Sequence, residues 1–151
     1  MKAALVFFFA GALMAHAQLS RLDAISMIET GSDDKMVGRA GEVSRYQIMP
    51  RVWKQYSNSE AYSDPAVSSQ VAQRHVDWLE SFFRNRAGRE MTEFDLYVMW
   101  NAGPGYYARK NFSPAQVAPS VRDRAERYAN LRSISPTQNL AATTVRSTGG
   151  R

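Results

Sequence analysis

The sequence contains no cysteine and only two histidines among its 151 residues. A domain without cysteine has to be held together by packing, which excludes the disulfide-stapled scaffolds of many small secreted proteins. Thiolate metal sites and cysteine nucleophiles are excluded as well. Since His16 lies in an apolar N-terminal run, a Ser-His-Asp triad or a multi-histidine zinc site would depend on His75 alone. His75 has no partner pattern around it, so we interpret it as structural and expect no metal and no cofactor.

Long hydrophobic runs are also missing. The apolar run at Ala3–Ala15 is too short for a good membrane span. It follows Lys2 and ends at a small-x-small site that closes with Ala17, the pattern of a secretory signal peptide. We predict cleavage after Ala17, which leaves 151 − 17 = 134 residues. This places the mature protein in the periplasm, the cell envelope or the extracellular space, without stable membrane insertion.

Acidic residues are in the minority. The chain has 19 Lys and Arg against 14 Asp and Glu, a formal charge of +5 that falls to +4 when Lys2 leaves with the signal peptide. Mild positive charge in an exported protein suits an acidic polymer such as cell-wall glycan, lipid headgroups or nucleic acid. Charge alone does not choose between them. Because no nucleic-acid-binding motif or clustered Lys/Arg face is recognisable, we expect no nucleic-acid partner.

Helical periodicity and capping residues predict a mainly α fold in one domain, residues 18–132, with a disordered tail over 133–151. The expected helices are 20–30, 51–56, 65–86, one capped by Thr92, a short one from Ser113-Pro114 and a last one capped by Ser120. Residues 31–41 read as a Gly-rich ordered loop, and residues 42–48 alternate like a small β-hairpin. The core face of the long helix is expected to carry Val67, Val71, Trp78, Leu79 and Phe82.

Glu29 is the strongest candidate in the sequence for a chemically active residue. It closes an apolar helical run and is followed by Thr30 and Gly31, a helix stop signal. A carboxyl at the last turn of a helix lies at the negative end of the macrodipole, which raises its pKa. Apolar neighbours would raise the pKa further by desolvation, so this carboxyl would stay protonated near neutral pH. That property is what a general acid needs.

Two further polar turns accompany Glu29. They are the stretch Gly41–Pro50 and the turn Asn101–Gly105, which reads Asn-Ala-Gly-Pro-Gly. Gln and Asn amides offer a paired donor and acceptor that suit hydroxyl and acetamido groups. Flat aromatic residues flank these turns and provide platforms for sugar rings; they are Tyr46, Trp100, Tyr106 and Tyr107.

These motifs resemble those of the soluble lytic transglycosylase family, whose lysozyme-like domain of goose-type topology cleaves peptidoglycan. The family motif Glu-Ser, loop, Gly-Ala-x-Gly-Leu-Met-Gln-Ile-Met-Pro is matched by Glu29-Thr30 and Gly41–Pro50, with 47 − 29 = 18 residues from Glu to Gln. The motif Tyr-Asn-Ala-Gly-Pro-Gly is matched by Trp100–Gly105. A third motif, a Tyr in the last helix, is matched by Tyr128. The resemblance spans Leu19 to Leu131.

The resemblance implies a fold and a set of roles. The fold would be a lysozyme-like helical domain with a small β-hairpin near the active site. Glu29 would protonate the glycosidic oxygen between N-acetylmuramic acid and N-acetylglucosamine and later take a proton back. The acetamido group of the substrate would attack the anomeric carbon, so no second carboxylate is needed, and a 1,6-anhydro product would form. The residues implied in substrate binding are Thr30, Tyr46, Gln47, Asn101, Ala102 and Tyr128.

Several positions depart from the family pattern. Thr30 replaces a Ser, Ser44 replaces a Gly, Arg45-Tyr46 replaces Leu-Met, and Gly38 falls where the loop often offers a Ser to the substrate. These changes concern substrate preference and rate more than they concern Glu29.

Two alternatives remain open at this point. Loop carboxylates could position a water and give a muramidase-type hydrolase; they are Asp33, Asp34 and Glu42. A catalytically inactive peptidoglycan-binding module is the other alternative. The expected partner is in each case the peptidoglycan strand, with a cell-envelope assembly as a possible second one.

Overall fold

The helices begin and end largely where capping residues predict. The computed structural model describes residues 19–134; the predicted signal peptide and nearly all of the predicted tail lie outside this range. The elements are α1 (Arg21–Thr30), α2 (Pro50–Trp53), α3 (Pro65–Ala87), α4 (Glu93–Ala102), α5 (Pro104–Ala108), a 3-10 turn η1 (Pro114–Gln116) and α6 (Pro119–Ser133). The prediction of a mainly α fold is confirmed. None of the helices within residues 19–134 has the length and apolar character to cross a membrane.

Side-chain caps start three of these helices. The Ser20 hydroxyl accepts a hydrogen bond from the Asp23 amide at the start of α1, and Asp64 accepts from two amides at the start of α3. Thr92 and Asp95 form a reciprocal capping box at the start of α4. At their C-terminal ends, α1 and α3 stop at Gly31 and Gly88, both with φ near +66° (67° and 66°). A glycine adopts this left-handed backbone without a steric penalty, so both stop signals are confirmed.

Two helices begin at residues that were not predicted, because in each a proline is the first helical residue. α6 begins at Pro119, with Ala118 as its N-cap, and not after Ser120. The turn after Asn101 contains the start of a further helix, α5, because Pro104 follows Gly103, whose φ is 88°. Proline has no N–H to lose at the first helical position and its φ already suits the helix, so a side-chain cap is unnecessary at both sites.

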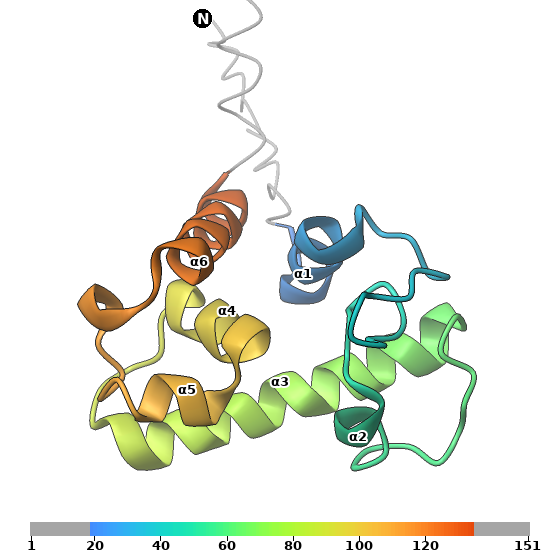
Figure 1. The fold of residues 1–151 in the computed structure, drawn as a ribbon, viewed down its shortest axis with the longest axis horizontal. Helices are drawn as coiled ribbons and strands as arrows, with labels where there is room; N and C mark the ends of the chain where they lie inside the picture. The colour runs from blue at the N-terminus through green and yellow to red at the C-terminus, as the bar shows by residue number, and fades with distance from the viewer. Residues whose placement is uncertain (1–18, 135–151) are drawn as a thin grey trace, which may run out of the picture. The chain divides into compact units, whose positions relative to one another are not determined.

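The core forms around α4. Five consecutive residues of α4 are fully buried, because this helix packs against α6 and α5 and also meets α3. They are Asp95, Leu96, Tyr97, Val98 and Met99. In Figure 1, α3 runs along one side of the helical assembly, with α4 and α6 above one half of it and α1 above the other. Glu29, near the end of α1, and Asn101, near the end of α4, line the same pocket.

The core face of α3 is rotated from the predicted one. Val71 and Leu79 are buried as expected, and Val67 and Phe82 are half-buried, but Trp78 is 44% exposed. The remaining buried positions are Ser68, Ala72, Val76 and Phe83. Since Trp78 precedes Leu79 by one residue, it lies about 100° further round the helix. It faces the groove described below, and its prediction as a core residue is wrong.

The predicted hairpin is reduced to one bridge. Val43 and Ile48 exchange both backbone hydrogen bonds, of 2.9 and 3.0 Å, in an isolated antiparallel bridge. No strand forms within residues 19–134. Ser44 and Gln47 have positive φ values, 65° and 51°, so the chain turns directly after Val43 instead of continuing as an extended strand.

Candidate functional site

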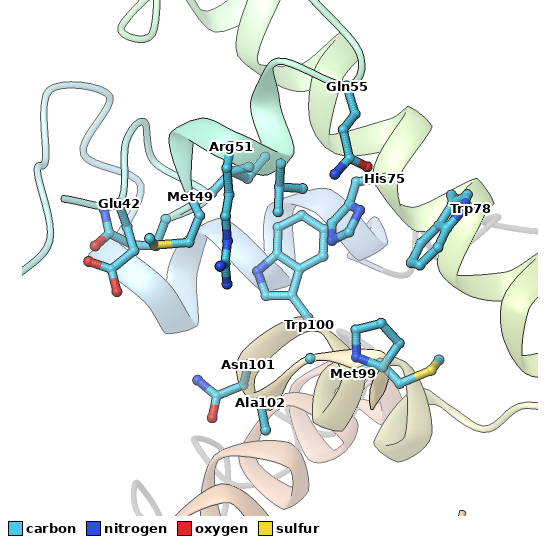
Figure 2. Close-up of a pocket in the computed structure, with 15 residues that line it drawn as sticks. Glu42, Met49, Arg51, Gln55, His75, Trp78, Met99, Trp100, Asn101 and Ala102 are labelled. Atoms are coloured by element: carbon cyan, nitrogen blue, oxygen red, sulfur yellow. The ribbon is translucent and has the colours of Figure 1, made fainter. Parts of the chain in front are cut away.

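Two adjoining pockets form one groove across the described domain. The larger has a volume of about 380 Å³ and the smaller, which contains Glu29, about 200 Å³. Four residues line both, so the pockets are continuous: Glu42, Gln47, Trp100 and Asn101. Figure 2 shows the larger half, where the loop carrying Glu42 and Met49, α2, α3 and the end of α4 each contribute side chains.

Glu29 is held in the wall of the smaller pocket. Its side chain is 7% exposed. The Tyr97 hydroxyl donates a hydrogen bond of 2.6 Å to its Oε1, and Arg124 donates one of 2.7 Å to its Oε2. Burial raises the pKa of Glu29, the bonds from Tyr97 and Arg124 oppose the rise, and the nearby Glu42 charge adds to it. The net pKa lies above the ordinary value, as the sequence predicts.

This arrangement suits a carboxyl that changes its protonation state. Burial favours the protonated form, which can donate a proton to an oxygen in the pocket. After donation, Tyr97 and Arg124 stabilise the carboxylate that is left. Both partners are on helices of the core, α4 and α6, so their positions are fixed by packing. The pocket therefore contains a buried carboxyl whose pKa is raised and whose carboxylate form has two hydrogen-bond donors in place.

The loop before α2 brings Gln47 and Glu42 into the groove. The Gln47 amide donates to the Ser44 carbonyl at 3.1 Å, and the Glu42 Oε2 accepts from the Ala40 amide at 3.0 Å. A Cβ at Gly38 would lie 2.2 Å from Glu42 Oε2 and 2.4 Å from Gln47 Oε1. The two side chains thus occupy the space that a serine at position 38 would need. In place of that serine, the Glu42 carboxylate and the Gln47 amide occupy this part of the groove.

The end of α4 supplies Asn101 and Ala102. Both line the larger pocket, and Asn101 also lines the smaller one. Within residues 19–134 the Asn101 side chain makes no hydrogen bond, so its amide is free to bind a ligand. Glu29, Gln47, Asn101 and Ala102 come together in the groove, although they are up to 73 positions apart, from 29 to 102, in the sequence.

Three residues predicted to bind substrate lie outside the lining of both pockets. The Thr30 hydroxyl donates to the Arg45 carbonyl and accepts from the Asp33 amide, both at 3.0 Å, and so fixes the loop to the end of α1. Tyr46 is 4% exposed, and its carbonyl accepts a bond from the Trp100 indole. Thr30 and Tyr46 therefore support the residues that line the groove, without lining it themselves.

Tyr128 is the third of these residues. It is fully buried, stacks on Tyr97 with ring centroids 4.9 Å apart, and donates to Glu93 at 3.1 Å. Contrary to the expectation, Tyr128 lines neither pocket, because its ring is buried against Tyr97 and its hydroxyl bonds to Glu93. Tyr97 is the tyrosine that contacts Glu29.

Sequence reasoning missed Tyr97 and Arg124. A signal for each existed, since Tyr97 lies one helical turn before Asn101 and Arg124 lies one turn before Tyr128. Neither residue stands out from its neighbours in the sequence. Tyr97 belongs to an apolar run, and Arg124 belongs to a helix rich in charge.

Three rings form an aromatic wall on one side of the larger pocket; Trp100 was predicted as a sugar platform, whereas His75 and Trp78 were not. His75 lies between Trp78 and Trp100, with ring centroids 6.0 and 5.1 Å away, and its Nδ1 is 3.1 Å from the Tyr56 hydroxyl. Burial lowers the pKa of His75 to about 4, so its ring is neutral at pH 7. Figure 2 shows the three rings side by side along the pocket. Neutral, flat surfaces of this kind suit the apolar faces of sugar rings.

The loop carboxylates have separate environments. Asp34 forms an ion pair with Arg45 through two bonds of 2.5 and 2.6 Å, and the guanidinium lowers its pKa. Asp33 accepts a bond from the Lys35 amide. Neither lines the groove, whereas Glu42 does. Within residues 19–134 no three His, Asp or Glu side chains are grouped so as to hold a metal ion.

Comparison of the chain with protein-family models, with curated proteins and with solved structures gives no match. The functional interpretation is therefore based on the motifs and on the geometry of the groove.

Proposed function

We propose that the protein is an exported peptidoglycan lytic transglycosylase with a lysozyme-like fold. One observation carries the proposal: the motif residues Glu29, Gln47 and Asn101 line one groove, in which Glu29 is buried and has a raised pKa. A single buried carboxyl with a raised pKa, beside amides and aromatic rings, is the set of groups that cleavage of a β-1,4 glycosidic bond by substrate assistance requires.

The reaction would proceed through Glu29 twice. Glu29 gives its proton to the glycosidic oxygen between N-acetylmuramic acid and N-acetylglucosamine, while the substrate's acetamido oxygen attacks the anomeric carbon. The C6 hydroxyl of the same sugar then displaces that oxygen and returns a proton to Glu29, which closes the 1,6-anhydro ring. Gln47 and Asn101 would hold the sugar and its acetamido group, and Ala102 would line the pocket beneath it. Tyr97 and Arg124 would stabilise the Glu29 carboxylate between the two steps.

A muramidase-type hydrolase is the second candidate, and Glu42 favours it. Its carboxylate lines the pocket of Glu29 and is anchored on the Ala40 amide. A second carboxylate in this place could position a water as the acceptor in place of the C6 hydroxyl. Glu29 remains the acid in both candidates.

Digestion of sacculi followed by mass spectrometry tests the proposal. We expect anhydro-muramic ends from the wild type and a loss of rate of about 10²- to 10⁴-fold for Glu29→Gln, the usual contribution of a general acid. Gln keeps the size of the side chain and an acceptor for Tyr97, so the fold should survive. Reducing ends would establish the hydrolase in place of the transglycosylase. Binding of sacculi without any product would show a binding module and refute an enzymatic role.

A further inference from the structure

The groove carries two arginines that have no partner within residues 19–134. Arg39 lines the half that contains Glu29, and Arg51 lines the larger half. Neither forms a hydrogen bond or an ion pair with another described residue. Several other arginines of the described residues are held by carboxylates, among them Arg21, Arg45, Arg89 and Arg124.

Arg51 is directed into the groove from a fixed platform. It belongs to the first turn of α2, which starts at Pro50 and is anchored by Trp53, a fully buried residue whose indole donates to the Ser59 carbonyl at 2.8 Å. Figure 2 shows the Arg51 side chain reaching into the pocket between Met49 and Trp100. The backbone of Arg51 is thus fixed, while its guanidinium is available to a ligand.

The charges of the groove favour an anion. Three arginines and two glutamates line it, which leaves at least one positive charge in excess whether or not Glu29 is ionised. Arg124 is engaged by Glu29, and Glu42 accepts a bond from the Ala40 amide. The cations without a partner are therefore Arg39 and Arg51, one in each half. A guanidinium offers parallel N–H donors that match the two oxygens of a carboxylate.

We propose that Arg51, supported by Arg39 in the other half, binds a carboxylate carried by the glycan strand, so that the groove selects acid-bearing strands over neutral sugar polymers. The inference rests on the proposed function and specifies its substrate. In peptidoglycan a carboxylate is available on the lactyl group of a muramic acid that carries no peptide, or on the peptide stem where one is attached to that group through an amide bond. Both sources have the same chemistry toward a guanidinium, and the experiment below distinguishes them.

Calorimetric titration of three soluble ligands tests the inference. Each is titrated into the full chain carrying Glu29→Gln, which prevents turnover. The ligands are a neutral N-acetylglucosamine tetramer, a peptide-free tetrasaccharide containing muramic acid, and the same tetrasaccharide with its peptide stems. Arg51→Gln should weaken binding of an acid-bearing ligand about tenfold and leave the affinity for the neutral tetramer within about twofold. Loss with the peptide-free ligand identifies the lactyl carboxylate, and loss only with the stem-bearing ligand identifies the peptide.

Two further variants control the measurement. Lys54→Gln removes the same charge from the C-cap of α2, outside the lining of the groove, and should change no affinity. Arg51→Lys keeps the charge but loses the planar fork, so it should give an intermediate affinity for the acid-bearing ligand. Because Arg51 has no partner within the described residues, its replacement should also leave the thermal unfolding midpoint unchanged.

The outcomes separate the inference from the proposed function. Arg51→Gln could weaken the binding of neutral and acidic ligands equally, or weaken neither. Either result would overturn the inference and leave glycan binding by the groove intact. Failure of all three ligands to bind the protein with Arg51 intact would overturn the proposed function, and the inference with it.

Discussion

Replacement of Tyr97 by Phe tests how the Tyr97 hydroxyl affects the pKa of Glu29. The change removes one oxygen atom, which donates a hydrogen bond of 2.6 Å to Glu29 Oε1. The ring itself stays in place, because it is fully buried and stacks on Tyr128. Since Tyr97 stabilises the carboxylate and not the acid, its loss must raise the pKa of Glu29.

The expected size of the effect follows from the bond that is lost. A hydrogen bond to a charged group contributes about 1.5–3 kcal/mol. At about 1.4 kcal/mol for each pH unit, the titration midpoint of Glu29 should move upward by about one to two pH units. Arg124 remains as a donor to Oε2 and limits the rise. In the proposed reaction, the proton-donating form of Glu29 would then persist to higher pH.

Carbon-13 NMR of labelled Glu and Asp carboxyls measures the midpoint directly and does not depend on any activity. The Glu29→Gln variant assigns the signal. Tyr107→Phe is the matched control, because it removes a hydroxyl that donates 2.5 Å to another buried carboxylate, Asp95. That variant should raise the pKa of Asp95 and leave the Glu29 titration unchanged. A Glu29 midpoint that stays in place or falls in Tyr97→Phe would refute the account of the site given above.

Two further predictions concern the loop and the core. Gly38→Ala forces the ends of the Glu42 and Gln47 side chains to move, since the new Cβ would lie 2.2 and 2.4 Å from their oxygens. Because the displaced atoms are the ends of flexible side chains, we expect a loss of only about 0.5 kcal/mol or less in denaturant unfolding, together with a loss of glycan cleavage. Wild-type cleavage would contradict the close packing. Asp95 is fully buried, and burial raises its pKa, but the bonds from Arg89, Tyr107 and Thr92 outweigh burial and lower it. Its stabilising contribution is therefore present above the pKa of the unfolded chain and is lost as pH falls through the lower folded pKa. Asp95→Asn should lower the free energy of unfolding by about 2–3 kcal/mol near pH 7. This is less than for a fully buried pair, because the Arg89 side chain is 38% exposed. The difference from wild type should shrink in acid, and a difference independent of pH would contradict the ion pair.

The sequence predicts the parts of this structure that depend on local chemistry. The stops at Gly31 and Gly88 and the caps at Ser20, Asp64 and Thr92 are set by residues within one helical turn, so they can be read directly. The direction of the Glu29 pKa shift was also predicted, although its largest cause, burial, depends on tertiary packing.

Features that depend on tertiary contacts could not be predicted in this way. The bond from Arg124 to Glu29 joins residues 95 positions apart, and no local pattern indicates which arginine of α6 reaches the groove. Tyr97 and Tyr128 are both plausible partners of Glu29 on paper, and only the packing of α4 against α6 decides between them. Trp78 was misplaced because a large apolar residue next to Leu79 looks like core, whereas the groove gives it a reason to be exposed.

Core packing and site geometry are coupled through α4. The burial of Leu96, Val98 and Met99 fixes the rotation of α4, and that rotation directs Tyr97 toward Glu29 and places Asn101 one turn further along in the groove. Hydrophobic burial is nondirectional and of the order of kilocalories for each side chain, so it can hold a charged group in an unfavourable environment. The position of the Tyr97 hydroxyl at Glu29 is therefore set by core residues of α4. The environment of the buried carboxyl in the groove depends on the same contacts that make the domain fold.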